Sequence, residues 1–240
     1  MKAIKITILA TGLLATCFAT ATAQTVDEIM TKHEKAVGGI ENWNKIKTLK
    51  MEGSAVQGGM EINMTQTVIV EKAMRMDVSV MGMTGFQICT NDGGWSYMPF
   101  TGKTTLDTMK PDVAKVMQKQ TDPKSIQMLN YKTDGTKIEL AGKDTINNAP
   151  CYKLKCTNSK GENSFCYIDM TTFYLTRLER TVKVDDQEQE MAVAFNNYQR
   201  LPEGVVMPMS VTAMGGEINY KSIEINKAVD EKLFIPAIEK

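Results

Sequence analysis

The residues with the most specific chemistry in this chain are methionines that occur in pairs, one residue apart. Three pairs share this spacing: Met74 and Met76, Met81 and Met83, and Met207 and Met209. On a strand, each pair would place two thioethers on the same face. Soft thioethers suit Cu(I), so a copper-binding protein is one interpretation. Methionine is also unbranched and adaptable, which suits a plain apolar core or the wall of an apolar cavity, and we favour the cavity wall.

The segment from residue 74 to residue 80 alternates strictly between apolar and polar side chains. Methionines and valines occupy the even positions, while Arg75, Asp77 and Ser79 occupy the odd ones. This period of two predicts a strand with one buried face and one solvated face. The predicted cavity wall comprises Met74, Met76, Val78, Val80, Phe86, Ile88, Trp95, Met117, Met207 and Met209.

Residues for catalysis or for binding a metal are sparse in the sequence. His33 is the single histidine and falls on the apolar stripe of a predicted helix, which indicates a histidine packed between helix and sheet. One histidine without a cysteine or carboxylate cluster makes a poor zinc site. No G-x-S-x-G, G-x-x-x-x-G-K-[ST] or G-x-G-x-x-G segment is present. We therefore expect a protein that is not an enzyme and that holds no metal or cofactor.

The N-terminus has the pattern of a secretory signal peptide. Lys2 and Lys5 precede an apolar run over residues 6–15, and Ala21-Thr22-Ala23 offers a small-residue cleavage site. We predict a signal peptide over 1–23 and a periplasmic protein. Lipid anchoring at Cys17 and an uncleaved anchor are the alternatives. Cleavage leaves 26 basic residues (28 minus 2) against 28 acidic ones, and this balance argues against a nucleic-acid partner.

Four cysteines follow the predicted cleavage site: Cys89, Cys151, Cys156 and Cys166. An even number in an exported protein permits two disulfides, in three possible pairings. Cys156 and Cys166 flank the turn-rich segment 158–163, and in a hairpin centred on Gly161 they would lie opposite each other. A disulfide between these two is possible, and the alternative is that both are small buried hydrophobic side chains.

The order of the elements predicts a mainly β, α+β protein with one domain over 24–240. Thr25 and Glu28 form a capping box before an apolar helical stripe, and Gly38-Gly39 ends that helix. A short helical turn over 40–46 follows, and helical spacing returns at 111–120. Strands are expected near 48–57, 60–71, 73–81, 85–91, 136–142, 150–157, 164–170, 172–184, 188–200, 205–214 and 217–226.

About eleven strands with short connections predict one large, curled antiparallel sheet. The concave face of such a sheet is apolar and must be covered. The predicted helices are too few to fill a wide groove, and this deficit is the physical argument for a cavity.

Both ends of the predicted domain carry a family resemblance. The matching segments are Val26-Asp27-Glu28-Ile29, Ala36-Val37-Gly38-Gly39, Trp43-Asn44-Lys45-Ile46-Lys47-Thr48-Leu49-Lys50-Met51-Glu52-Gly53 and Val229-Asp230-Glu231-Lys232-Leu233-Phe234-Ile235-Pro236. They resemble exported Bacteroidetes outer-membrane lipoprotein-sorting proteins, which are similar to the LolA/LolB/LppX superfamily. The resemblance implies an unclosed half-barrel of about eleven strands, lidded by a few helices. Its cavity would hold the acyl chains of a lipoprotein or of another lipid.

The resulting prediction is a monomeric, periplasmic carrier of lipid or acyl chains. The resemblance adds lipoprotein sorting to the outer membrane as a possible role. An envelope adaptor or sensor that binds a protein partner is the alternative, and a methionine-based copper-binding protein is a further one.

Overall fold

A computed structural model describes residues 24–184, 187–213 and 216–237 of this chain. The predicted signal peptide and Cys17 lie outside these residues. Within them, thirteen strands form one antiparallel sheet in the order β6-β5-β4-β3-β2-β1-β13-β12-β11-β10-β9-β8-β7. The strands are β1 (Thr48–Gln57), β2 (Met60–Ile69), β3 (Ala73–Val80), β4 (Met83–Thr90), β5 (Gly93–Tyr97), β6 (Asp107–Thr108), β7 (Lys137–Ile146), β8 (Ala149–Thr157), β9 (Asn163–Asp169), β10 (Leu175–Val184), β11 (Gln187–Arg200), β12 (Val206–Ala213) and β13 (Gly216–Ile225).

The sheet is not closed, because β6 and β7 at its two ends do not pair with each other. Its first and last long strands, β1 and β13, pair in the middle of the sheet. The predicted fold class is confirmed. The strand count is thirteen rather than about eleven because the short strands β5 and β6 extend the sheet beyond β4.

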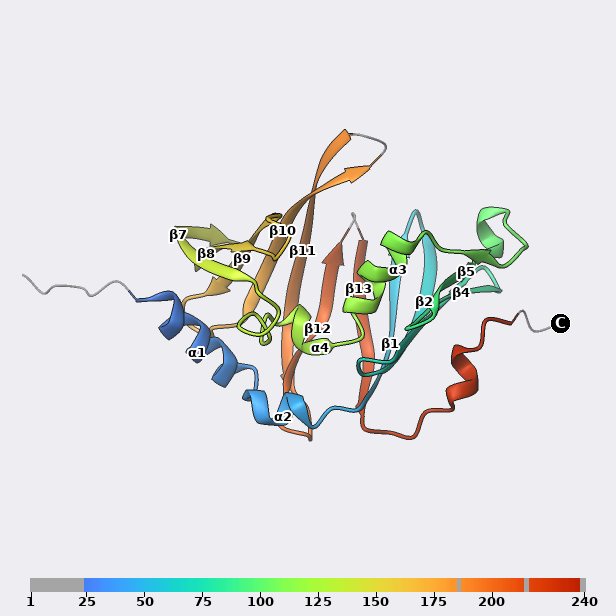
Figure 1. Ribbon diagram of the computed structural model, residues 1–240, viewed down its shortest axis with the longest axis horizontal. Coiled ribbons are helices and arrows are strands. Elements are labelled where there is room, and N and C mark those ends of the chain that lie inside the picture. Colours follow the sequence, from blue (N-terminus) through green and yellow to red (C-terminus); the bar gives the residue numbers. More distant parts are fainter. Residues whose placement is uncertain (1–23, 185–186, 214–215, 238–240) are drawn as a thin grey trace, which may run out of the picture.

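The helices follow one another across one face of the sheet (Figure 1). They are α1 (Val26–Ala36), α2 (Ile40–Asn44), α3 (Pro111–Lys119) and α4 (Pro123–Ile126), with 3₁₀ turns η1 (Pro99–Thr101) and η2 (Glu231–Phe234). Thr25 caps α1 through the predicted capping box with Glu28. We call the sheet face under the α-helices the inner face and the opposite one, on which η2 lies, the outer face. Among the described residues, no helix has the length and apolar character needed to cross a membrane.

Three apolar clusters form the core. Two of them contain residues of the α-helices or the loops beside them, and lie on the inner face. The first includes Ile29, Met30, Met128, Leu154, Cys156, Cys166, Ile168 and Phe195. The second includes Val37, Trp43, Ile46, Leu49, Met51, Val68, Met74, Val205, Met207 and Ile225. The third includes Ala73, Phe86, Ile88 and Phe234, so η2 covers it from the outer face.

His33 joins α1 to the rest of the inner core. Its side chain is fully buried, with Nδ1 2.7 Å from the Phe173 carbonyl oxygen and Nε2 2.8 Å from that of Gln127. The prediction of a histidine packed between helix and sheet is confirmed.

Candidate binding face

Strand pairing arranges the inner-face side chains of β3, β2, β1 and β13 in rows across the sheet. The lowest row contains Met74, Val68, Leu49 and Ile225, which are direct partners on neighbouring strands. These four side chains are at most 3% exposed. They pack with Trp43 of α2, so the helices cover this row completely.

The rows above this one are covered less. Going up β3, Met76 aligns with Gln66 and Met51, Val78 aligns with Met64 and Gly53, and Val80 aligns with Ile62 and Ala55. We call these three rows the open strip. Met76, Val78 and Val80 are half-buried, whereas Met74 one row below is fully buried. Apart from Gln66, the open strip has only apolar side chains and glycine. Its β1 residues Met51, Gly53 and Ala55 are buried, so the partly accessible apolar surface lies on β2 and β3.

The open strip is bordered by the η1 loop on one side. Gly85 of β4 is the partner of Val78 and faces the same way. A Cβ at Gly85 would lie 3.0 Å from the Met98 sulfur and 3.0 Å from a ring carbon of Phe100. Met98 and Phe100 therefore rest on β4 beside the strip.

Helix α3 contributes a second apolar border. Ala114 is buried and Met117 packs against the inner core. With 100° between residues, Val113 and Val116 lie on the same flank of the helix as Met117. They are 48% and 50% exposed, respectively. This flank is an exposed apolar ridge on a helix whose other flank carries lysines.

The structure divides the predicted wall residues between the two faces. Seven lie on the inner face: Met74, Met76, Val78, Val80, Met117, Met207 and Met209. Met74, Met117 and Met207 meet in one packed cluster. Phe86, Ile88 and Trp95 are not with them, because Phe86 pairs with Asp77, and Ile88 pairs with Arg75 and Trp95. These three belong to the outer cluster beneath η2.

Sequence reasoning missed several side chains of the open strip. Ile62 and Met64 alternate with polar residues in the segment Met60–Ile69, so periodicity alone could have identified them. Gly53 and Ala55 continue the alternation of Leu49 and Met51 in β1, but their small side chains give only a weak apolar signal. Their place on the strip depends on the pairing of β1 with β2.

Two small pockets lie away from the α-helices. A pocket of about 230 Å³ lies between β1 and β13 and is lined by Ser54, Ala55, Val56, Glu217 and Asn219. Another of about 170 Å³ lies beside η2 and includes Ala73 and Phe234. Both are below the roughly 300–1,000 Å³ of ordinary ligand sites. The base of the inner face is closed by packed side chains, as the burial of Met74, Val68, Leu49 and Ile225 shows.

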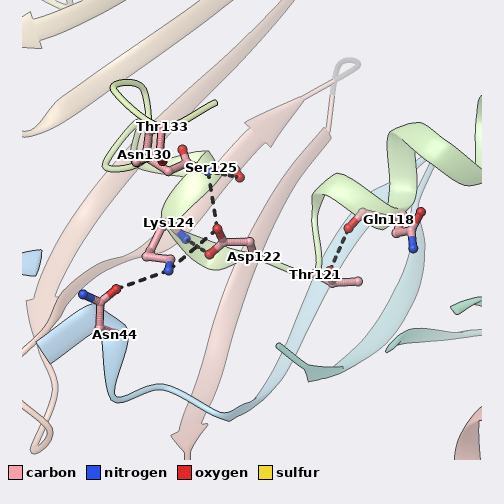
Figure 2. A network of polar contacts seen from close by, with 8 residues as sticks. All are labelled: Asn44, Gln118, Thr121, Asp122, Lys124, Ser125, Asn130 and Thr133. Carbon is pink, nitrogen blue, oxygen red and sulfur yellow. Dashed lines mark hydrogen bonds and ion pairs between the residues drawn. The ribbon is translucent and has the colours of Figure 1, made fainter. Parts of the chain in front are cut away.

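A network of polar contacts holds the segment between α3 and α4 in place (Figure 2). Asp122 Oδ1 accepts a hydrogen bond from the Lys124 backbone N–H at 3.0 Å, and Oδ2 accepts one from Asn130 Nδ2 at 3.3 Å. Lys124 Nζ donates to Asn44 Oδ1 of α2 at 3.2 Å. Burial raises the pKa of Asp122, and these hydrogen bonds and the Lys124 charge oppose it in part. We call this network the lid latch, because it connects α4 and the loops on either side of it to α2.

The residues for metal binding are few. The described part of the chain has no group of three or more His, Cys, Asp or Glu side chains that could hold a metal ion. Met74 is fully buried, and its sulfur accepts a hydrogen bond from Gln66 Nε2 at 3.0 Å. The Met74 sulfur is thus buried in the core and hydrogen-bonded to Gln66.

Comparisons with known proteins identify the fold. No protein-family model matches the sequence, and no match is found among curated proteins. A LolA superfamily protein from Nitrosomonas europaea has a similar structure, with a TM-score of 0.55, 12% identity and coverage of 89% of this chain and 98% of that one. A DUF1329 family protein from Desulfovibrio piger has a TM-score of 0.54, 13% identity and coverage of 89% and 98%. A Vibrio parahaemolyticus domain named for outer membrane lipoprotein sorting has a TM-score of 0.50, 10% identity and coverage of 86% and 94%. The fold is thus LolA-like.

Proposed function

We propose that this protein is a periplasmic carrier that binds the acyl chains of a lipid on its inner face. The observation that carries the proposal is the gradient of burial along β3. Met74 is sealed beneath the helices, while Met76, Val78 and Val80 form a half-buried apolar surface with no charged side chain. Apolar surface that is continuous with a core and incompletely covered is typical of a site that takes an apolar ligand.

Binding would require the helices α3 and α4, which we call the lid, to move. Met117 of α3 and Met207 of β12 fill the space beneath the helices in the closed form. An acyl chain would displace these side chains and lie along the open strip, with α3 and α4 shifted outward. Each buried methylene contributes about 0.8 kcal/mol, which is offset by the cost of rearranging the lid. Methionine side chains suit this displacement, because they are flexible enough to pack either against the helices or against an acyl chain.

The proposal also includes the cellular location of the protein and the kind of lipid that it carries. The signal-peptide pattern over residues 1–23 supports export to the periplasm, after which the protein would act as a monomer. The likeness to a domain named for lipoprotein sorting supports the acyl chains of a lipoprotein as one possible cargo. We propose binding rather than catalysis, because the open strip presents apolar side chains and no nucleophile or general base.

The test is a matched pair of charge substitutions on the two faces of one hairpin. Val78→Asp places a carboxylate on the open strip, and Thr84→Asp places one on the exposed outer side of β4. Burying a charge against an acyl chain costs several kcal/mol, so Val78→Asp should weaken binding of a fluorescent fatty acid by about 100-fold or more. Thr84→Asp should leave the dissociation constant unchanged. Circular dichroism of both variants checks that they fold.

Equal binding by folded Val78→Asp and by the unchanged protein would rule out the open strip as the acyl site. Native mass spectrometry of protein purified from its own envelope gives the second measurement. A co-purified lipid supports the carrier. A stoichiometric protein partner without lipid would favour an envelope adaptor instead.

A further inference from the structure

Two buried cysteines face each other across the strands β8 and β9. The expectation that they lie directly opposite is wrong, because Cys156 pairs with Ser164 and Cys166 pairs with Leu154. The two residues are diagonal neighbours on the same face of the sheet. Their sulfur atoms are nevertheless hydrogen-bonded, with Sγ–Sγ 3.4 Å, and both thiols are reduced in this structure.

We propose that Cys156 and Cys166 form a disulfide-forming site, in which Cys156 attacks an external disulfide and Cys166 then resolves the mixed disulfide. This site is separate from the proposed acyl-binding surface and does not depend on it. The bond would connect β8 to β9 within the apolar cluster that also contains Met30 of α1.

The two thiols are not equivalent. Cys156 is 5% exposed and stands one residue before the end of β8, while Cys166 is 1% exposed. The hydrogen bond between the sulfurs lowers the pKa of Cys156, because it stabilises the thiolate there. The same bond and burial raise the pKa of Cys166 well above its ordinary value. The thiolate is the attacking form, so Cys156 is the residue that meets the oxidant first.

The other two described cysteines provide an internal contrast. Cys89 Sγ lies 3.2 Å from the Ala114 carbonyl oxygen, and Cys151 Sγ lies 3.5 Å from the Ala149 carbonyl oxygen. Burial raises the pKa of both thiols. Each interacts with oxygen atoms of the protein rather than with another sulfur, so neither has a partner for a disulfide in the described part of the chain.

The reaction is a balanced thiol–disulfide exchange. The Cys156 thiolate attacks one sulfur of the external disulfide and releases the other as a thiol. Cys166 then loses its proton and attacks the Cys156 sulfur, which releases the second thiol. Two protein thiols are oxidised and one external disulfide is reduced to two thiols. The sulfurs must approach from 3.4 Å to about 2.05 Å. Diagonal neighbours on adjacent strands lie about 7–8 Å apart, so the backbones of β8 and β9 must move closer as the bond forms.

The main experiment is a peptide map of the whole protein after incubation with glutathione disulfide. The protein is alkylated in denaturant without reductant and digested with trypsin. Cleavage after Lys155, Lys160 and Arg177 places the two cysteines in the separate peptides 156–160 and 161–177. The expected result is one linked pair of these peptides, lighter than their sum by two hydrogens. Cys89 and Cys151 should be alkylated in the same sample.

Two variants test the order of attack. Cys166→Ser should retain glutathione on Cys156, because no second thiol is present to resolve the mixed disulfide. Cys156→Ser should leave Cys166 free of glutathione in the folded protein, since that thiol is fully covered. If Cys156 and Cys166 are both fully alkylated after incubation with glutathione disulfide, no disulfide has formed between them and the proposal is refuted. Glutathione held on Cys166 in folded Cys156→Ser would overturn the assignment of the attacking thiol. The peptide map uses the unchanged protein. It therefore decides whether the disulfide forms even if a substitution impairs folding.

Discussion

The lid latch offers a direct way to change how often the inner face opens. Asp122→Ala removes the side-chain acceptor of the Lys124 N–H at the start of α4, and also the acceptor of Asn130 Nδ2. Loss of an N-cap costs about 1 kcal/mol, and loss of a further hydrogen bond costs about 0.5–1.5 kcal/mol. Removing a half-buried carboxylate offsets part of this loss, because burial disfavours its charge and raises its pKa. We therefore expect a net cost of about 1 kcal/mol, confined to the lid.

A cost of about 1 kcal/mol corresponds to a roughly fivefold larger population of the open lid. Hydrogen exchange read by mass spectrometry should show about fivefold faster exchange in peptides covering residues 120–131. Peptides covering β12 should exchange as before, because β12 pairs within the sheet. If lid opening limits ligand entry, the association rate of a fluorescent fatty acid should rise by a similar factor.

Asp122→Asn is the comparison variant, because its amide oxygen still accepts from the Lys124 N–H while the charge and the acceptor for Asn130 Nδ2 are removed. The pKa of Asp122 is raised in the folded protein above the ordinary 3.8. The part of its stability that comes from protonation is therefore present below pH 3.8 and is lost as the pH rises through the folded pKa, while its hydrogen bonds as an acceptor remain. This loss should be absent in Asp122→Asn. In Asp122→Ala, hydrogen exchange over residues 120–131 could stay unchanged while the free energy of global unfolding decreases. That result would refute the prediction that the lid latch controls local opening of the lid. The lid would then be held by its apolar contacts rather than by the latch.

Two further predictions concern the helix α1 and the turn after it. Burial is the largest influence on His33 and lowers its pKa below the ordinary 6.5, so the stability it contributes above pH 6.5 should be lost as the pH falls through the folded value. The melting temperature should therefore decrease as the pH is lowered from 7.5 to 5. In His33→Gln this decrease should be smaller. A melting temperature of the unchanged protein that does not depend on pH over this range would contradict a neutral His33. Gly38 has a φ of +106°, and a Cβ there would overlap the Gly204 carbonyl oxygen, so Gly38→Ala should cost about 2 kcal/mol or more in urea unfolding. Gly39→Ala, with a φ of +81° and open space around it, should cost about 1 kcal/mol, and equal costs would show that the contact with Gly204 is unimportant.

Local signals in the sequence were sufficient for α1, α2, α3 and most strands, but not for the short helix α4. The capping box at Thr25 and Glu28 uses side chains three residues apart, so it forms wherever the chain places it. Pro111 at the first turn of α3 likewise acts on its own segment. The strand β6 has only two residues and no periodicity to detect, which is why the sheet was expected to end earlier.

Side-chain direction was harder to predict, because it depends on register rather than on composition. Phe86 and Ile88 are as apolar as Met74, and nothing in their types assigns them to another face. The tight turn at Met81-Gly82 pairs Val80 with Met83, and this register places Cys89 rather than Ile88 beside Met74. The cysteine hairpin is a second case, because its pairs are centred on Lys160 rather than on Gly161. A shift of one residue in a turn reassigns every partner along both strands.

The separation of the two faces has a consequence for the proposed binding cycle. The outer cluster is covered by Phe234 of η2, and Arg75 fixes that cover through a 2.8 Å hydrogen bond from Nη1 to the Leu233 carbonyl oxygen. Arg75 also lies over the Phe86 ring and pairs with Asp77. These contacts do not involve α3 or α4. Strand β3 is therefore supported from the outer face while the lid moves on the inner one. A sheet held in this way can expose Met76, Val78 and Val80 to a ligand without losing its own order.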